Sequence, residues 1–457
     1  MRYRFVDLWV ALFLALVLSV SGLMPTNVKA ADLDQSQIAD LVGNSYLSTN
    51  PDTGKRLLHL EGGPYQMGFQ QGYWLASGVY RMTHEYIVYV LESFGLSESS
   101  YDALRPALIA TCHANELAVP LEYRMEMLGV ADGAQAQGYD VTYDDVMLIN
   151  MAFDVLLSVA YPLATPLIAL QEGGYGLPLD CDAFVAYGNA TTDHGVLMGR
   201  DFMFTPHVFS EEALLVEYFP SSGSPFVSVT APGFVGVTSA MNANGIAIGM
   251  DMVPEISTKP LAPGMGCLLT ARKVIQYSQE LSDAINTIKC IPRGVSWLYV
   301  IGDGGGNNIG GAVVEASPDL VRVRYTNYRY IGYFLPEKYF PRQIENKDDL
   351  VVVANHYIIP AMILANGSYA IEDSLWRYET LTGLLLDKYG SIDVESGKGL
   401  VDYLHPPAYG YYGDDPNQPI GASRTLYDLS NLKLWSLYGN YNDSWVYYDL
   451  GSRLSNQ

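Results

Sequence analysis

The sequence predicts an α+β protein in which sheets are covered by helices. Residues 31–180 have mostly helical patterns, whereas from Cys181 onward short apolar runs alternate with turn residues, as β-strands do. Two helical stretches, Leu268 to Lys289 and Ser374 to Lys388, interrupt these strands. Runs of strands with helices grouped between them are typical of layered α+β domains.

Residues 1–30 have the pattern of a signal peptide. Arg2 and Arg4 precede an apolar run of 16 residues from Leu8 to Leu23, and small residues at Val28-Lys29-Ala30 suit cleavage. A spanning helix needs about 20 apolar residues, so we expect removal rather than anchoring. We therefore expect an extracytoplasmic protein, secreted or in the cell envelope, with no stable membrane span after signal removal.

The chain is strongly acidic. Its formal net charge is −23, and it becomes −25 when residues 1–30 are removed. Such a surface repels phosphate backbones, so we expect no nucleic-acid partner. Hydrophobic residues make up 49% of the chain, which is enough for a large core.

The segment before Cys181 contains one clear amphipathic helix and one helix start. Thr142 with Asp145 three residues later resembles a capping box. Residues Gln171 to Pro178 (QEGGYGLP) are Gly-rich and predict an exposed loop just before Cys181. The apolar face of the helix has spacings of three and four and consists of Leu75, Val79, Met82, Tyr86 and Val90.

Strands follow Cys181 as far as the C-terminus. Phe184 to Gly188 and Val196 to Phe204 flank Thr192-Asp193-His194-Gly195, which predicts a hairpin. Residues Gly302 to Gly306 are interpreted as a second hairpin turn. The other expected strands are Leu214 to Phe219, Phe226 to Thr230, Phe234 to Met241, Ile246 to Met252, Trp297 to Ile301, Ala312 to Glu315, Val321 to Tyr325, Leu350 to Ala354, Thr425 to Asp428, Leu432 to Leu437 and Trp445 to Leu450.

Four cysteines are too few for a disulfide-built fold. Cys267 and Cys290 flank a helical stretch and would lie about 30 Å apart if it were continuous, whereas a break near Ser282 would let them pair. The sequence leaves the pairing of Cys112, Cys267 and Cys290 open. If Cys181 is a nucleophile, it must stay free.

Several common catalytic signatures are missing. No Gly-x-Ser-x-Gly elbow occurs, the Gly302 to Gly306 run lacks the Gly-Lys-Ser/Thr ending of a phosphate-binding loop, and the seven histidines form no paired metal-ligand spacing. We therefore predict neither a cofactor nor a metal site.

The position of Cys181 indicates a different chemistry. A lone cysteine is usually a buried small hydrophobe. If the chain is cut before Cys181, however, one residue supplies both a thiol and a free α-amine, whose ordinary pKa near ~8 makes it a base at working pH. No histidine is then required.

Two segments before Cys181 carry a family resemblance. Leu60 to Gly72 (LEGGPYQMGFQQG) and Leu128 to Gly133 (LGVADG) resemble the prosegment motifs of the choloylglycine hydrolase and isopenicillin N acyltransferase group of N-terminal-nucleophile (Ntn) hydrolases, in its acyltransferase branch. The resemblance extends over nearly the whole mature chain.

The second half resembles the same family at five places. Cys181 to Phe184 is similar to the nucleophile strand, and Gly199 to Phe204 to its return strand. Met241 to Gly249 resembles the strand that ends near an oxyanion-hole residue. Ala354 to Tyr357 and Ser374 to Tyr378 resemble the elements that carry an oxyanion-binding asparagine and a second arginine.

This resemblance implies an αββα sandwich, autocatalytic cleavage before Cys181, and hydrolysis or transfer at a linear amide. It implies roles at the site for Arg200, Asp251, Asn355 and Arg377. Each has a structural alternative: Arg200 in a buried ion pair with a carboxylate, Asn355 in a turn, and Arg377 as a solvated helix charge.

Three departures from the family pattern concern the same site. Met203 stands where the family has an aspartate that orients the free amine, Asp251 where many members have asparagine, and Asp180 where glycine often precedes the nucleophile. Asp201 is a candidate replacement for the missing carboxylate, with Asp251 next. Asp201 is displaced from position 203 by about 6.6 Å along a strand, so a bulge or a water would be needed.

The sequence thus predicts three segments: a signal peptide (1–30), a mainly helical fragment (31–180) and an αββα catalytic fragment (181–457). The expected activity is hydrolysis of a small N-acylated amide through a Cys181 thioester, with the cleaved N-terminal fragment as the protein partner. The alternatives are an acyltransferase of the same fold and a non-catalytic envelope binding protein.

Overall fold

The computed structural model describes residues 33–93, 98–168, 180–203, 208–253, 259, 264–306, 309–327, 347–366, 372–404, 423–439 and 443–455. The expected signal peptide, the Gly-rich segment 171–178 and Phe204 lie outside the described residues. Within the described part of the chain, no helix is long and apolar enough to cross a membrane.

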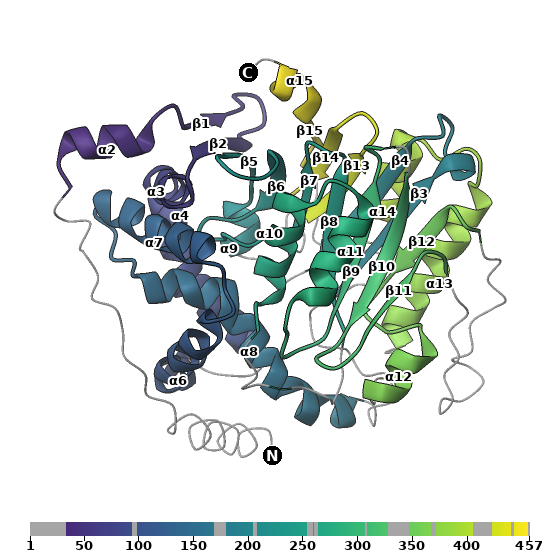
Figure 1. The fold of residues 1–457 in the computed structure, drawn as a ribbon, viewed down its shortest axis with the longest axis horizontal. Coiled ribbons are helices and arrows are strands. Elements are labelled where there is room, and N and C mark those ends of the chain that lie inside the picture. The colour runs from purple at the N-terminus through teal and green to yellow at the C-terminus, as the bar shows by residue number, and fades with distance from the viewer. Residues whose placement is uncertain are drawn as a thin grey trace.

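Two β-sheets form the centre of the molecule (Figure 1). The larger has nine strands in the order β1-β2-β5-β6-β7-β8-β9-β10-β11, and the smaller has six in the order β12-β3-β4-β13-β14-β15. The strands of the larger sheet are Tyr46–Thr49 (β1), Arg56–Gly62 (β2), Leu214–Pro220 (β5), Phe226–Thr230 (β6), Ser239–Asn242 (β7), Ile246–Met252 (β8), Trp297–Asp303 (β9), Gly310–Ala316 (β10) and Val321–Arg324 (β11). Those of the smaller sheet are Asp180–Tyr187 (β3), Val196–Met203 (β4), Leu350–Val353 (β12), Ser423–Asp428 (β13), Lys433–Leu437 (β14) and Val446–Asp449 (β15).

Helices cover the outer face of each sheet, giving four layers. Helices α10 (Cys267–Tyr277) and α11 (Leu281–Cys290) pack on β7 to β10, and α13 (Glu372–Asp387) and α14 (Val394–Leu404) pack on β3, β4, β12 and β13. One hydrophobic core contains residues of both sheets, and a second lies between the smaller sheet and α13 and α14. The αββα sandwich implied by the family resemblance is confirmed.

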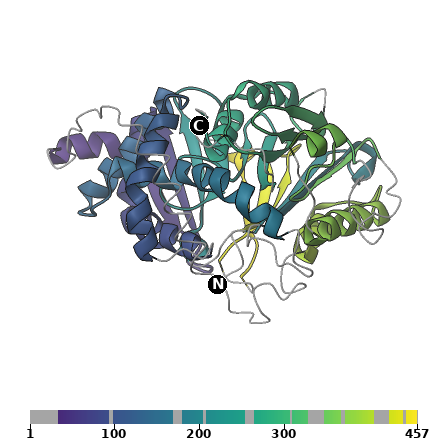
Figure 2. The same cartoon turned by 90° about the horizontal axis from the view of Figure 1, so that it is seen from below.

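The helices of the N-terminal segment lie at one side of the molecule, opposite the group of α12 to α14, except that α8 extends from there toward the middle (Figures 1 and 2). They are α2 (Gln35–Val42), α3 (Pro64–Trp74), α4 (Ala76–Arg81), the π-helix η2 (Met82–Tyr86), α5 (Ile87–Ser93), α6 (Glu98–Glu116), α7 (Leu121–Ala136) and α8 (Tyr143–Ile168). The remaining short helices are η3 (Gly188–Ala190), α9 (Val208–Glu212), α12 (Pro360–Asn366) and α15 (Leu450–Ser455).

Two local predictions for this segment are confirmed. All five residues of the predicted apolar face, Leu75 to Val90, are buried. The capping box closes in both directions, since the backbone nitrogen of Thr142 donates to the Asp145 carboxylate at 2.8 Å and the nitrogen of Asp145 donates to the Thr142 hydroxyl at 3.3 Å.

The segment is not only helical, since it also contains β1 and β2, which the sequence patterns did not predict. Strand β2 runs parallel to β5, with His59 opposite Glu217, so the N-terminal segment supplies the edge of the larger sheet. Any cut at Cys181 would therefore leave two fragments that share one sheet.

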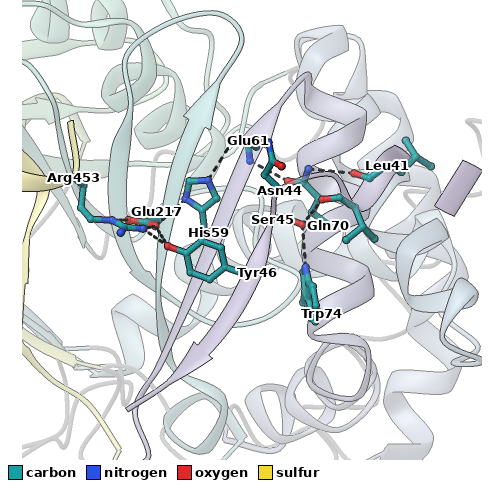
Figure 3. Close-up of polar contacts among 11 residues, drawn as sticks. Leu41, Asn44, Ser45, Tyr46, His59, Glu61, Gln70, Trp74, Glu217 and Arg453 are labelled. Atoms are coloured by element: carbon teal, nitrogen blue, oxygen red, sulfur yellow. Dashed lines mark hydrogen bonds and ion pairs between the residues drawn. The ribbon is translucent and has the colours of Figure 1, made fainter. Parts of the chain in front are cut away.

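A polar cluster around Glu217 holds this edge to the C-terminus (Figure 3). The buried carboxylate of Glu217 lies 2.8 Å from Nδ1 of His59 and accepts from Nε of Arg453 at 3.0 Å. The Tyr448 hydroxyl also donates to it, and Tyr46 stacks on the His59 ring. Glu217 thus joins β2 in the N-terminal segment to β15 and α15.

The other expected strands form close to their predicted bounds except one, and one expected helical stretch is divided. The expected strand Phe234 to Met241 begins only at Ser239, because a turn joins Ala231 and Phe234. The stretch 268–289 is two helices separated at 278–280, yet all four cysteines are free. Both predicted hairpins, β3–β4 and β9–β10, are antiparallel pairs.

Candidate active site

Cys181 is the second residue of β3 and is almost fully buried. It belongs, with Ala183 and Val185, to the core that both sheets share. Alternate residues of a strand point to opposite faces, so the thiol is directed toward the larger sheet. Its Sγ lies 3.9 Å from the carbonyl oxygen of Met203 on the neighbouring strand.

Asn355 contacts the backbone nitrogen of Cys181. Strand β12 pairs antiparallel with β3, with Val353 opposite Ala183, and two further residues bring Asn355 level with Cys181. The side-chain oxygen of Asn355 accepts from the Cys181 nitrogen at 2.8 Å, and its amide nitrogen donates to the carbonyl of Met252, also at 2.8 Å. From the sequence, Asp201 was the candidate partner of the Cys181 nitrogen; in the structure that partner is Asn355.

Arg377 projects from α13 to the same point. Its guanidinium donates to the Cys181 carbonyl at 2.7 Å and to the Asn355 oxygen at 2.8 Å, and it lies 3.5 Å from Asp182. Only 1% of Arg377 is exposed, so it is not a solvated surface charge. The backbone on both sides of the Cys181 α-carbon is therefore fixed by side chains.

Arg200 lies on the same sheet face as Cys181 and bridges the two sheets. Its guanidinium forms a buried ion pair with Asp251 on β8 and donates to the Met250 carbonyl. Gly249 makes room for it, since a Cβ there would lie 2.8 Å from the Arg200 side chain. Both partners are fully buried, so each charge depends on the other.

The charges around the thiol act in opposite directions. The pKa of the Cys181 thiol is raised to about 12, because the effect of burial, to which Asp251 adds, outweighs the opposite effect of Arg200 and Arg377. In the uncleaved chain the thiol is thus almost entirely protonated at neutral pH, and the arginines favour its thiolate form.

Asp201 and Met203 are directed to the other face of the smaller sheet. Asp201 pairs across the strands with Asp182, and Met203 pairs with Asp180. Burial raises the pKa of Asp182 well above its usual range, the nearby Asp201 raises it further, and Arg377 opposes both. Asp182 is a site residue to which the sequence gave no role.

His356, next to Asn355, is buried and lies 2.7 Å from the Ser374 hydroxyl. Burial, together with the positive charges of Arg324 and Arg377, lowers the pKa of His356 to about 3. The imidazole therefore stays neutral at physiological pH and is unsuited to act as a proton donor.

An apolar pocket opens beside the thiol. It encloses about 780 Å³ of space, part of it open to solvent, and its described lining is aliphatic and aromatic apart from Cys181 and Thr238. Eight of the seventeen lining residues precede Cys181 in the chain and lie on η2, α5 and α8. The helical segment and the sheets thus build one pocket together.

The two prosegment motifs serve as packing surfaces. Gly68 and Gly72 on α3 face Gly129 and Gly133 on α7, and a Cβ at Gly68 would lie 2.0 Å from the carbonyl oxygen of Glu126. Only glycine allows this close approach of two helices. The motifs therefore fix the helical wall rather than contribute groups to the site.

Among the described residues, no group of three or more His, Cys, Asp or Glu side chains could hold a metal ion. The site consists of a thiol, two arginines, an amide and carboxylates. Such a set suits acyl transfer, because the thiol can accept an acyl group while fixed polar groups stabilise the developing charge.

Comparison with known proteins identifies a family. The model of the family described as acyl-coenzyme A:6-aminopenicillanic acid acyl-transferase matches residues 191–440, a range that begins ten residues after Cys181. An uncharacterized protein of Archaeoglobus fulgidus is 56% identical over 444 residues, covering 97% of this chain and 72% of the relative. Protein dcd1A of Dictyostelium discoideum is 22% identical over 378 residues, covering 78% and 75%.

Two solved structures are similar to parts of the chain. An N-acylethanolamine-hydrolyzing acid amidase ortholog of Caenorhabditis elegans is 12% identical and covers 55% of this chain and 93% of its own, with a TM-score of 0.38. Penicillin V acylase of Agrobacterium tumefaciens is 14% identical and covers 59% and 86%, with a TM-score of 0.39.

Proposed function

The chain belongs to the acyl-coenzyme A:6-aminopenicillanic acid acyl-transferase family, and on that basis we propose that it is a self-cleaving amidase with Cys181 as its nucleophile. The proposed substrate is a linear amide of an N-acylated small molecule. The observation that carries the proposal is the buried Cys181, whose thiol borders an apolar pocket and whose nitrogen is held by Asn355.

The proposed first event is self-cleavage. The Cys181 thiol attacks the carbonyl carbon of Asp180, the peptide bond to the Cys181 nitrogen breaks, and the acyl group passes to sulfur. Water then hydrolyses the thioester, leaving a carboxylate at Asp180 and a free α-amine at Cys181. Arg200 favours this step because its positive charge lowers the thiol pKa.

The proposed turnover uses the same thiol on an external amide. The new α-amine, with an ordinary pKa near ~8, takes the thiol proton while sulfur attacks the substrate carbonyl. The leaving amine receives a proton as the C–N bond breaks, and water releases the acyl group as a carboxylic acid. In this proposal Asn355 orients the amine and, with Arg377, stabilises the oxyanion; the contact of Asn355 with the Cys181 nitrogen supports the first role.

The apolar pocket is the proposed site of the acyl group. No described lining residue is charged, so the pocket favours an apolar acyl chain and disfavours a charged one. Because the helices before Cys181 form half of the lining, the N-terminal fragment has to stay bound after cleavage. We also propose that residues 1–30 direct export, so the protein would act outside the cytoplasm.

Acyl transfer to an amine is the second candidate, and the description of the matching family favours it. The two reactions share the thioester and differ only in whether water or an amine attacks it. We favour hydrolysis, because outside a cell acyl-coenzyme A donors are scarce and water is the abundant nucleophile that can attack the thioester.

The test is to incubate the purified protein and a Cys181→Ala control with a panel of N-acyl amides, with and without a second amine. Hydrolysis predicts released amine, free acid and an acyl adduct on the Cys181 fragment. A new amide formed at the expense of free acid would assign transfer instead. Equal amine release by Cys181→Ala would overturn the nucleophile assignment.

A further inference from the structure

Trp297 separates the apolar pocket from a second pocket. It is the one residue, among those described, that lines both. The second pocket encloses about 430 Å³ and has a more polar lining that includes Asp154 and Arg293. A side chain shared by two cavities is the wall between them.

The position of Trp297 relates this wall to the nucleophile. Asn355, which holds the Cys181 nitrogen, also donates to the carbonyl of Met252. Met252 lines the apolar pocket and pairs directly with Trp297 on the neighbouring strand β9. The pocket therefore extends from Cys181 past Met252 to the indole.

The indole is held in one orientation. Its Nε1 donates to Asp154 at 2.7 Å, and the other oxygen of Asp154 accepts from the backbone nitrogen of Cys267 at 3.0 Å. The Phe153 ring contacts the indole with a centroid distance of 5.9 Å. Trp297 is 3% exposed, and these two contacts fix the orientation of the wall.

We infer that Trp297 determines substrate specificity by closing the acyl pocket and setting the longest acyl chain that the site accepts. The inference rests on the proposed amidase function and specifies its substrate class as amides of apolar acids up to a fixed chain length. A longer chain would meet the indole and, behind it, the Asp154 carboxylate, which an apolar chain would desolvate.

The experiment measures kcat/KM for a series of N-acyl-4-nitroanilides that differ only in the length of a straight acyl chain. Beyond its best chain length, the wild type should lose about tenfold or more for each added methylene. Trp297→Ala joins the two pockets, so it should recover at least about tenfold on those longer chains and move the optimum to a longer acid.

Tyr299→Leu is the matched control, because Tyr299 lines only the second pocket. It removes a ring on the far side of the wall and leaves the indole and the acyl pocket in place, so the longest accepted chain should not change. Trp297→Leu provides a smaller change in case the alanine variant does not fold, and should shift the optimum in the same direction.

The outcomes separate this inference from the proposed function. A wild type that releases no nitroaniline from any chain contradicts the amidase assignment. An active wild type, with folded Trp297→Ala and Trp297→Leu variants that keep the wild-type chain-length profile, overturns the role of Trp297 and leaves the amidase intact.

Discussion

The backbone nitrogen of Cys181 donates to the side-chain oxygen of Asn355 over 2.8 Å. The two residues are 174 positions apart in the chain, and the antiparallel pairing of β3 with β12 brings them together. Cleavage before Cys181 would turn this nitrogen into the free amine of the proposed mechanism, with its acceptor already in place.

Two substitutions separate the possible roles of Asn355. Asn355→Ala should lower kcat by about 10² to 10³ if the amide donates to an oxyanion. Asn355→Asp keeps an oxygen for the Cys181 nitrogen but loses the donor, so we expect normal self-cleavage with the low kcat of the alanine variant. Fragment analysis and steady-state kinetics measure both. A kcat near wild type in Asn355→Asp would show that Asn355 only positions the amine.

Arg200 should control the rate of self-cleavage through the thiol pKa. Burial raises that pKa to about 12 and Arg200 lowers it, so below pH 12 the thiolate fraction, and with it the cleavage rate, should rise with pH. Arg200→Gln should slow cleavage by about tenfold for each pKa unit gained, whereas Arg200→Lys keeps the charge. Freshly translated precursor, sampled over time at pH 7 to 9, provides the measurement. Equal rates in Arg200→Gln and wild type would exclude this electrostatic role.

The Glu217 cluster should contribute stability that depends on pH. Burial raises the pKa of Glu217, but hydrogen bonds from His59, Arg453 and Tyr448 outweigh it and lower the pKa to about 2, against an ordinary value of 4.5. A depressed carboxyl pKa stabilises the fold above the unfolded value and loses that effect as pH falls toward the folded value.

Glu217→Gln should therefore cost about 3 kcal/mol of stability at pH 7, and the difference from wild type should shrink between pH 4.5 and pH 2. Thermal unfolding across this range tests the expectation. Glu61→Gln, whose carboxylate is 32% exposed on the neighbouring strand β2, is the control and should change little. A difference that does not vary with pH would assign the loss to packing instead.

The glycines of the first prosegment motif should differ sharply in their tolerance of a methyl group. Gly68→Ala places a Cβ 2.0 Å from a backbone oxygen of α7, while Gly63→Ala meets nothing within 4 Å. We expect a loss of about 3 kcal/mol or more for the first and about 1 kcal/mol or less for the second. Chemical denaturation measures both. Similar losses at the two positions would show that α3 and α7 can move apart freely.

Much of the fold could be predicted from local pattern. Apolar residues 184–187 of β3 and 196–198 of β4 lie on either side of turn residues, and the helix around Val79 has one apolar face. Strands β1 and β2 were missed. Strand β1 has only four residues and pairs with β2, whereas β2 leads directly into α3 and pairs with β5, which is distant in the chain. The composition of residues 234–238 predicts a strand, yet the chain turns between Ala231 and Phe234 and β7 begins only at Ser239.

The site was less accessible to sequence reasoning. The position of Cys181 after a Gly-rich loop indicated a nucleophile, and a buried Arg200 indicated a carboxylate partner. The identity of that partner, Asp251, depends on how two sheets face each other, which no local pattern encodes. Asp182 was missed for the same reason, since its significance comes from Arg377 and Asp201 on other elements.

The most direct test of the account is the intact mass of the purified protein beside that of Cys181→Ala. The account predicts a 277-residue fragment that begins at Cys181, and a companion of 150 residues if the chain is also cut after Ala30. Cys181→Ala should remain a single chain across the 180–181 bond. An unbroken wild-type chain, or the same cut in Cys181→Ala, would contradict self-cleavage by Cys181.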